Sequence, residues 1–285
     1  MVSWRTQANG GSVRSTLRPD CLVRGLWRNR ALIWTMVVRE IQSRYRGSFV
    51  GLGWYVVQNL CQLAIFTFVF GVVFKARWQV DQADSQQVAF APVLFLGLIL
   101  FNFFSEPVGR APSLIIGNVN YVKKVVFPLD VLPVVAVGTA LFNAGIGVGV
   151  FVVLAFAMGT PISPTIIWLP LALAPVALLA LGTTWFLASF GVFVRDTAQV
   201  IGLLLTALMF FSPIFYPAAA LPESWRWLLF ANPLSMPIEQ ARGMALFGQS
   251  PDLVAIGYAT GLGVFAAYLG WVWFQVTRRG FADVI

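Results

Sequence analysis

Long hydrophobic runs dominate the chain and alternate with short polar segments. About 18–20 uninterrupted apolar residues are needed for a helix to cross the ~30 Å hydrocarbon core of a bilayer. Such runs cover residues 50–74, 89–106, 131–158, 165–190, 197–217 and 253–276. The second run is short and closes at Glu106-Pro107, so five or six spans are compatible with the pattern. We take six, and the fold class predicted is an all-α polytopic membrane protein.

Residues 31–47 show a different pattern, in which apolar residues recur every three or four positions. These apolar positions are Ala31, Trp34, Val38, Ile41 and Tyr45. Charged and polar residues fall on the opposite side, which is typical of an amphipathic helix. Aromatic residues on one face and arginines on the other predict a helix in the cytoplasmic membrane interface, with a packed soluble helix as the alternative. Residues 1–30 form a basic cytoplasmic arm, and residues 48–285 form the transmembrane domain.

Prolines and tryptophans mark the region around the end of the fifth run. Pro213 and Pro217 should break the helix near the outer leaflet. The segment from Pro217 to Asp252 is too apolar for a simple loop, and we expect short helices there, with Trp225 and Trp227 at the outer interface.

Composition supports a membrane protein and argues against several other classes. Hydrophobic residues make up 59% of the chain and charged residues 11%, whereas soluble domains average about 45–50% and about 25%. The net charge of +8 could indicate nucleic-acid binding. With both termini cytoplasmic, however, all but four of the 19 Lys and Arg residues fall on the inner side, as the positive-inside bias requires. We therefore expect no nucleic-acid partner, and a bacterial inner-membrane location.

The sequence lacks the usual residues for catalysis or energy conversion. It contains no His, and its two cysteines, Cys21 and Cys61, are placed too differently to pair or to form a metal site. None of the predicted spans holds an ionisable residue in its interior, which argues against proton coupling. No lysine follows the glycine that a Walker motif requires. The chain is therefore expected to be no enzyme and to hold no cofactor, with any energy supplied by another polypeptide.

The first span carries a stripe of uncharged polar and aromatic residues. Its members at helical spacing are Tyr55, Gln58, Asn59, Gln62 and Phe66. Amides facing lipid would lack hydrogen-bond partners, so the stripe should face protein or water. One interpretation is a helix–helix contact held by amides. The other interpretation is the wall of a channel for a neutral, hydroxyl-rich polymer. Phe211, Phe215 and Tyr216 at the end of the fifth span would add an aromatic cluster to this channel. The alternative for that cluster is an ordinary aromatic belt at the membrane interface.

Several short motifs, taken together in their order, resemble the membrane subunits of type-2 ABC exporters of O-antigen, capsular and teichoic-acid polysaccharides. The motifs are Arg39-Glu40-Ile41, Arg44-Tyr45-Arg46-Gly47-Ser48, Gly51-Leu52-Gly53-Trp54, Val122-Lys123-Lys124-Val125-Val126-Phe127-Pro128, Arg195-Asp196, Ser212-Pro213-Ile214-Phe215-Tyr216-Pro217 and Asn232-Pro233. The resemblance covers nearly the whole chain from about Ala31.

This resemblance implies a homodimer around one channel, driven by two copies of an ATPase subunit that binds ATP and Mg. It also implies a polyprenyl-diphosphate-linked polysaccharide as substrate, with Arg44 and Arg46 attracting the diphosphate at the entrance. The residues expected to couple the channel to the ATPase are Arg39, Glu40, Asn118, Asn120, Tyr121, Lys123 and Lys124. An exporter of drugs or lipids and a membrane enzyme acting on lipid-linked sugars are the alternatives.

Overall fold

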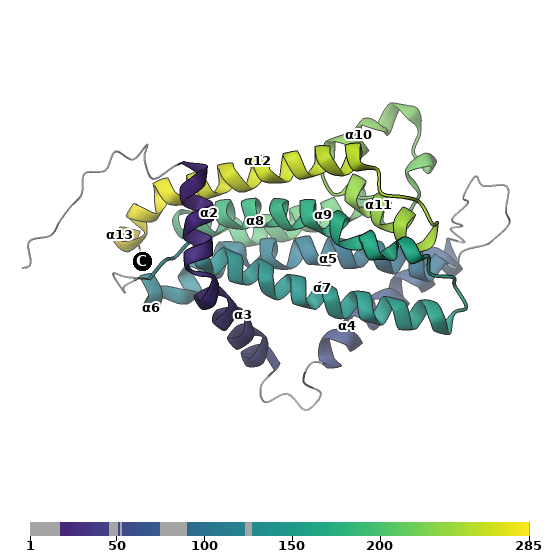
Figure 1. Ribbon diagram of the computed structural model, residues 1–285, viewed down its shortest axis with the longest axis horizontal. Coiled ribbons are helices and arrows are strands. Elements are labelled where there is room, and N and C mark those ends of the chain that lie inside the picture. Colours follow the sequence, from purple (N-terminus) through teal and green to yellow (C-terminus); the bar gives the residue numbers. More distant parts are fainter. Residues whose placement is uncertain (1–17, 46–50, 52, 75–89, 123–126, 285) are drawn as a thin grey trace, which may run out of the picture.

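The computed structural model describes residues 18–45, 51, 53–74, 90–122 and 127–284, and every regular element among them is helical. Figure 1 shows a bundle of long helices running along a common axis, with α3 and α4 diverging from one side of it. The helices are α2 (Pro19–Arg28), α3 (Arg30–Tyr45), α4 (Gly53–Phe66), α5 (Phe90–Leu114), α6 (Val119–Val122), α7 (Val131–Ala157), α8 (Leu169–Phe193), α9 (Thr197–Phe211), α10 (Trp227–Ala231), α11 (Ser235–Leu246), α12 (Leu253–Thr277) and α13 (Phe281–Val284). These elements confirm the predicted all-α polytopic class.

Five segments of the described chain are long and apolar enough to cross a membrane. They are Gly53–Val73, Phe90–Leu114, Val131–Ala157, Pro164–Phe193 and Leu253–Gly280. The first joins α4 to a π-helix, Thr67–Val73, and the fourth joins a 3₁₀ turn, Pro164–Trp168, to α8. The fifth predicted span, 197–217, contains α9, which has 15 residues and ends before Ser212-Pro213. At 1.5 Å per residue, α9 is about 22 Å long.

The end predicted for the second span is wrong. α5 continues past Glu106-Pro107 and Pro112 to Leu114. A proline inside a helix removes one backbone donor, but neighbouring helices in a membrane protein compensate for this loss. α5 is the central helix, packed against α7, α8, α9 and α11. As a result Glu106 and Arg110 lie within a helix of membrane-crossing length, which corrects the expectation that the spans hold no ionisable residue.

Glycines allow the closest helix pair to form. α8 and α12 pack more extensively than any other two elements. A Cβ atom built on Gly270 would lie 2.0 Å from the carbonyl oxygen of Gly182, and one on Gly182 would lie 2.3 Å from the backbone of Ala266. Small residues at such contacts let two backbones approach and gain dispersion energy along their length.

The amphipathic segment forms α3, which lies beside α7. Val37 packs against Gly138 of α7, where a Cβ would be 2.9 Å from a Val37 methyl group. Met36 and Val37 are buried, whereas Trp34 on the predicted aromatic face is exposed. Ile41 of the predicted apolar face packs against the core, so this face is buried in part, while Trp34 points outward. α2 precedes α3 and lies within residues 1–30, the basic arm for which no helix was predicted.

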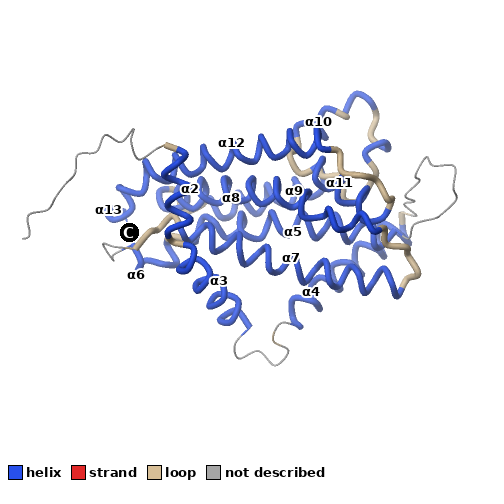
Figure 2. The backbone as a smooth tube through the Cα atoms, in the orientation of Figure 1, coloured by secondary structure: helices blue, strands red, loops and turns tan. Residues whose placement is uncertain are grey.

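The region after α9 folds back on the bundle. Figure 2 shows its loops and short helices at the end of the bundle opposite α2 and α6. Its short helices agree with the expectation for Pro217 to Asp252, and Trp225 and Trp227 are exposed. α11 is different, because it packs against both α5 and α8 and is largely buried.

Candidate functional site

A groove beside α4 brings the whole of the predicted polar stripe together. Its volume is about 1150 Å³. The side chains that line it come mainly from α4 and from the second half of α5, and they include all five residues of the stripe: Tyr55, Gln58, Asn59, Gln62 and Phe66. Trp54, Asn102 and Ser105 also line it. The groove thus combines aromatic faces with uncharged hydrogen-bonding groups.

Part of the amide stripe holds α4 against α5. The Asn102 side-chain amide donates to Oε1 of Gln62 at 3.0 Å and to Oδ1 of Asn59 at 3.4 Å. Asn59 in turn donates to the carbonyl oxygen of Tyr55 at 2.8 Å. Gln58 is exposed in the groove. The helix–helix interpretation therefore applies to Asn59 and Gln62, while the stripe as a whole still faces an open groove.

The aromatic cluster predicted after α9 lies partly behind the groove. Phe215 is 4% exposed and does not line it. Its ring packs edge-on against Phe66, with 4.9 Å between centroids, and stacks on Phe70 at 4.4 Å. Tyr216 donates its hydroxyl to the carbonyl oxygens of Phe210 and Phe211, both at 3.3 Å. Phe215 therefore packs against the end of the first span, whereas Tyr216 caps the end of α9.

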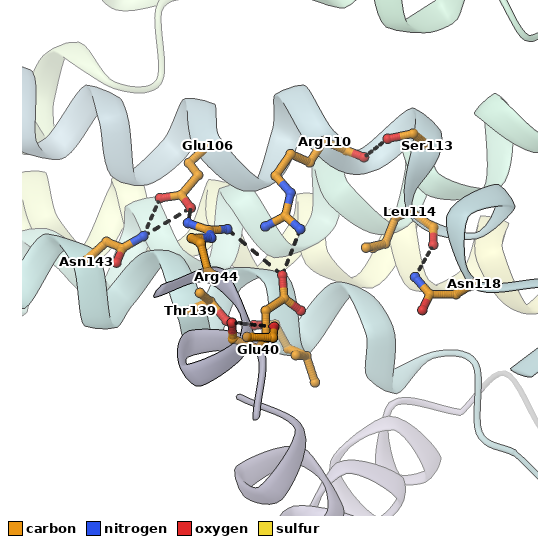
Figure 3. Close-up of polar contacts among 11 residues, drawn as sticks. Glu40, Arg44, Glu106, Arg110, Ser113, Leu114, Asn118, Thr139 and Asn143 are labelled. Carbon is orange, nitrogen blue, oxygen red and sulfur yellow. Dashed lines mark hydrogen bonds and ion pairs between the residues drawn. The ribbon is translucent and has the colours of Figure 1, made fainter. Parts of the chain in front are cut away.

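Four charged side chains form a network at one end of the groove, joining α3 and α5. Figure 3 shows Arg44 between Glu106 and Glu40, and Arg110 reaching Glu40 from α5. Arg44 forms an ion pair with Glu106 and lies 3.9 Å from Glu40, while the Arg110 guanidinium donates to Glu40 at 2.8 Å. Asn143 of α7 donates to both Glu106 oxygens, at 3.1 and 2.9 Å. We call Glu40, Arg44, Glu106 and Arg110 the charged network.

The charged network is neutral and half-buried. Two arginines balance two glutamates, and side-chain exposures range from 21% for Glu106 to 45% for Arg110. Arg44, Glu106 and Arg110 also line the groove. Arg44, for which the resemblance implied contact with a diphosphate, thus lies at this end of the groove, and that role stays a prediction. Arg46 lies outside the described residues.

A second contact links α3 to the short helix α6. Arg39 donates to the Tyr121 hydroxyl at 2.6 Å, and the Tyr121 ring stacks on Phe127 with 4.4 Å between centroids. Asn118 donates to the carbonyl oxygen of Leu114 at 2.8 Å and so ends α5. Asn120 is exposed. Of the predicted coupling residues, Lys123 and Lys124 lie outside the described residues.

A buried arginine ties three elements together at the opposite end of the bundle. Arg242 of α11 is 1% exposed. Its guanidinium donates to the carbonyl oxygens of Val93 at 3.0 Å and Ile214 at 2.8 Å, and also to that of Pro213. Glu239 accepts a further bond at 3.3 Å. Desolvation lowers the pKa of Arg242 to about 10, so the side chain stays charged at neutral pH. The sequence predicted short helices in the segment that holds Arg242 and no buried charge there; the structure places Arg242 inside the protein on α11.

The family described as "ABC-2 type transporter" matches residues 31–246, which is most of the chain. The chain belongs to the ABC-2 type transporter family. The match runs from α3 to α11, and so includes the groove, the charged network and Arg242 of this ABC-2 membrane domain.

Curated relatives of this ABC-2 protein align over nearly their full lengths. The O-antigen export system permease protein RfbA of Myxococcus xanthus is 28% identical over 93% of this chain and 99% of its own. RfbA of Klebsiella pneumoniae is 24% identical over 89% and 95%. The polysialic acid transport protein KpsM of Escherichia coli is 25% identical over 85% and 91%.

Sequence reasoning missed half of the charged network in this ABC-2 domain. Glu106 and Arg110 were assigned to the inner side because Glu106-Pro107 suggested that the second span ended there. A signal was nevertheless present, since Glu40 and Arg44 are four residues apart on one helix, the spacing at which opposite charges meet. Their partners on α5 lie more than 60 residues away and cannot be identified from spacing alone.

Proposed function

We propose that this chain is the transmembrane subunit of an ATP-driven exporter that moves a lipid-linked polysaccharide, O-antigen-like or capsular, across the bacterial inner membrane. The observation that carries the proposal is the groove of about 1150 Å³, lined by amides and aromatic rings, in an ABC-2 membrane domain. Sugar hydroxyls exchange hydrogen bonds with amides, and the C–H faces of sugar rings pack on aromatic rings. Relatives named for O-antigen and polysialic acid transport support the same substrate class.

The working unit in this proposal is a homodimer with two ATPase subunits. The groove is open on one side, and large apolar side chains are exposed along the helices beside it. They include Val57, Leu60, Ile65 and Phe68 of the first span and Val200, Leu203 and Leu204 of α9. A second copy facing this side would close the groove into a channel. The partner ATPase binds ATP and Mg, because the chain has no Walker lysine.

The proposed orientation places both termini in the cytoplasm. α2, α3, α6 and α13 then lie at the cytoplasmic end, and α10 and α11 at the outer end (Figure 1). Basic residues concentrate at the first end, as short cytoplasmic segments require. The contact between Arg39 and Tyr121 then joins α3 to the segment that would receive the motion of the ATPase.

Co-purification tests this function most directly. The tagged chain is expressed with the ATPase encoded next to it, and the complex is sized by light scattering. We expect two copies of each subunit and vanadate-sensitive ATP hydrolysis. A stable chain that never retains an ATPase contradicts the exporter. A 2:2 complex whose ATP hydrolysis responds to small amphiphiles and not to a lipid-linked glycan would favour the drug or lipid exporter instead.

A further inference from the structure

The groove meets two guanidinium groups that come from different helices. Arg44 belongs to α3 and Arg110 to α5, and both line the groove. A guanidinium presents a planar fork of donors, which matches phosphate oxygens as well as carboxylate oxygens. In this structure both forks bind carboxylates, Arg44 that of Glu106 and Arg110 that of Glu40.

We propose that Arg44 and Arg110 form a masked anion site, which binds the phosphoryl groups of a lipid-linked substrate when these groups displace Glu106 and Glu40. This inference rests on the proposed export function and deepens it. It adds Arg110 to the site and assigns the two glutamates as competitors for the arginines. The ligand class is a diphosphate esterified to a lipid chain.

Binding to these two arginines requires competition with their carboxylates. The four charges of the network sum to zero, and each arginine already faces a glutamate, so an anion reaches the guanidinium groups by displacing Glu106 and Glu40. A diphosphate carries more charge than one carboxylate and offers oxygens to both arginines at once. It therefore gains by replacing the two glutamates together, while the partly exposed position of all four groups lets water solvate the displaced carboxylates.

The network also provides for release. Two uncovered arginines beside a membrane would also attract and retain other anionic lipid headgroups. Carboxylates that return to the arginines lower the affinity, and transport requires binding weak enough for the substrate to leave. Asn143 holds both oxygens of Glu106, so this carboxylate stays close to Arg44 during the exchange.

Substitution of the competing carboxylates separates this site from a purely structural network. The full chain is reconstituted in nanodiscs of phosphatidylcholine, and binding of farnesyl diphosphate is measured by thermophoresis. We expect Glu106→Gln to bind the probe about tenfold more tightly than the native chain, which corresponds to the loss of one competing ion pair. Glutamine keeps an oxygen that accepts from Asn143. Arg44→Gln and Arg110→Gln should each weaken binding at least tenfold. In the double variant that combines Glu106→Gln with Arg110→Gln, the loss of Arg110 should cancel much of the gain in affinity.

The controls identify the group that binds. Arg226→Gln, at the opposite end of the bundle, should bind as the native chain does. Farnesol and inorganic pyrophosphate should both bind more weakly than farnesyl diphosphate. If farnesol bound equally well, the site would not recognise phosphoryl groups. If pyrophosphate bound equally well, the site would not require a lipid-linked ligand. Glu40→Gln should also tighten binding, because it removes the carboxylate that competes for Arg110. It replaces Glu106→Gln in the experiment if the Glu106→Gln protein does not fold. Native or weaker affinity in both Glu106→Gln and Glu40→Gln contradicts masking.

These outcomes are independent of the test of export. A chain that binds farnesyl diphosphate as expected but retains no ATPase keeps the anion site and loses the exporter. A 2:2 complex with an ATPase, in which the glutamine substitutions change nothing, keeps the exporter and loses the masked site.

Discussion

At the scale of single residues, Arg242 shows how a charge is stabilised inside the protein. The helix break after Phe211 leaves the carbonyl groups of Pro213 and Ile214 without helical donors. A buried carbonyl without a donor costs about 1–3 kcal/mol. The guanidinium supplies donors to both, and to Val93 at the start of α5. One side chain therefore joins α5, α11 and the segment after α9.

Gly97 leaves the space that this guanidinium occupies. A Cβ atom on Gly97 would lie 2.5 Å from Nη2 of Arg242. Because Arg242 is held by several carbonyl groups, it cannot move away without losing hydrogen bonds. We expect Gly97→Ala to lower the free energy of unfolding by about 1–3 kcal/mol, the usual cost of overpacking a core. The measurement is thermal unfolding in detergent.

A matched control is available in α7. A Cβ on Gly145 has no neighbouring heavy atom within 4 Å. Gly145→Ala should therefore leave stability unchanged or raise it slightly, because alanine favours a helix over glycine. Equal stability of the Gly97→Ala and Gly145→Ala proteins would show that Arg242 does not need its observed position.

Single residues were the level at which the sequence was least informative. Arg242 follows two prolines in a mixed segment and resembles a loop residue. Its partners are mostly backbone carbonyl groups, which carry no sequence signal. Glu106 precedes a proline, a common sign of a helix end. Both were misplaced because tertiary contacts, and not local preference, determine their surroundings.

At the scale of elements, the pairing of α8 and α12 depends on the absence of side chains. Gly270→Ala would place a methyl group 2.0 Å from the carbonyl oxygen of Gly182, so the two helices would have to separate. We expect this variant to yield little monodisperse protein on size-exclusion chromatography. The reason is that separation removes dispersion contacts along the whole pair, and backbone atoms cannot be repacked as side chains can.

Gly261→Ala is the corresponding control within α12. A Cβ there meets no heavy atom within 4 Å. This variant should purify as the native protein does. Comparable yields of the two alanine variants would mean that the interface tolerates a wider helix spacing than the structure shows.

The bounds of a helix were predicted well where the length of its hydrophobic run alone determines them. The predicted spans 131–158 and 253–276 correspond closely to α7 and α12. α5 extends eight residues beyond its predicted end, from 106 to Leu114, because packing on several sides outweighs its prolines. α3 was located correctly, but the burial of Met36 and Val37 was not predicted, since neither belongs to the apolar positions that recur along the helix.

At the scale of the whole molecule, burial is distributed unevenly across the bundle. α5 is the most buried of the long helices and the segment containing α4 is the least buried. Figure 1 shows α4 standing at the side of the bundle. The groove therefore lies between the best-packed and the least-packed helix. In the proposed dimer, this side becomes the lining of a water-filled channel.

Cys61 reports whether the groove contains water. It is exposed and lines the groove. The thiolate is the reactive form of cysteine, and it forms only where water is present. In the Cys21→Ser protein in nanodiscs, we expect a membrane-impermeant maleimide to label Cys61 almost as fast as a membrane-permeant one.

The complementary variant supplies the reference rate. In Cys61→Ser, the exposed Cys21 of α2 remains, and both reagents should label it. Labelling of Cys61 by the permeant reagent alone would mean that lipid tails fill the groove, which contradicts an aqueous channel.

The shortness of α9 has a consequence for the membrane itself. About 22 Å of helix faces a hydrocarbon core of ~30 Å, and its exposed leucine and valine side chains would be in direct contact with acyl chains wherever no second copy covers them. Such a mismatch is relieved when the bilayer thins locally, at a fraction of a kcal/mol per ångström. The protein should therefore carry a ring of compressed lipid beside α9 and should favour thinner bilayers made of shorter acyl chains.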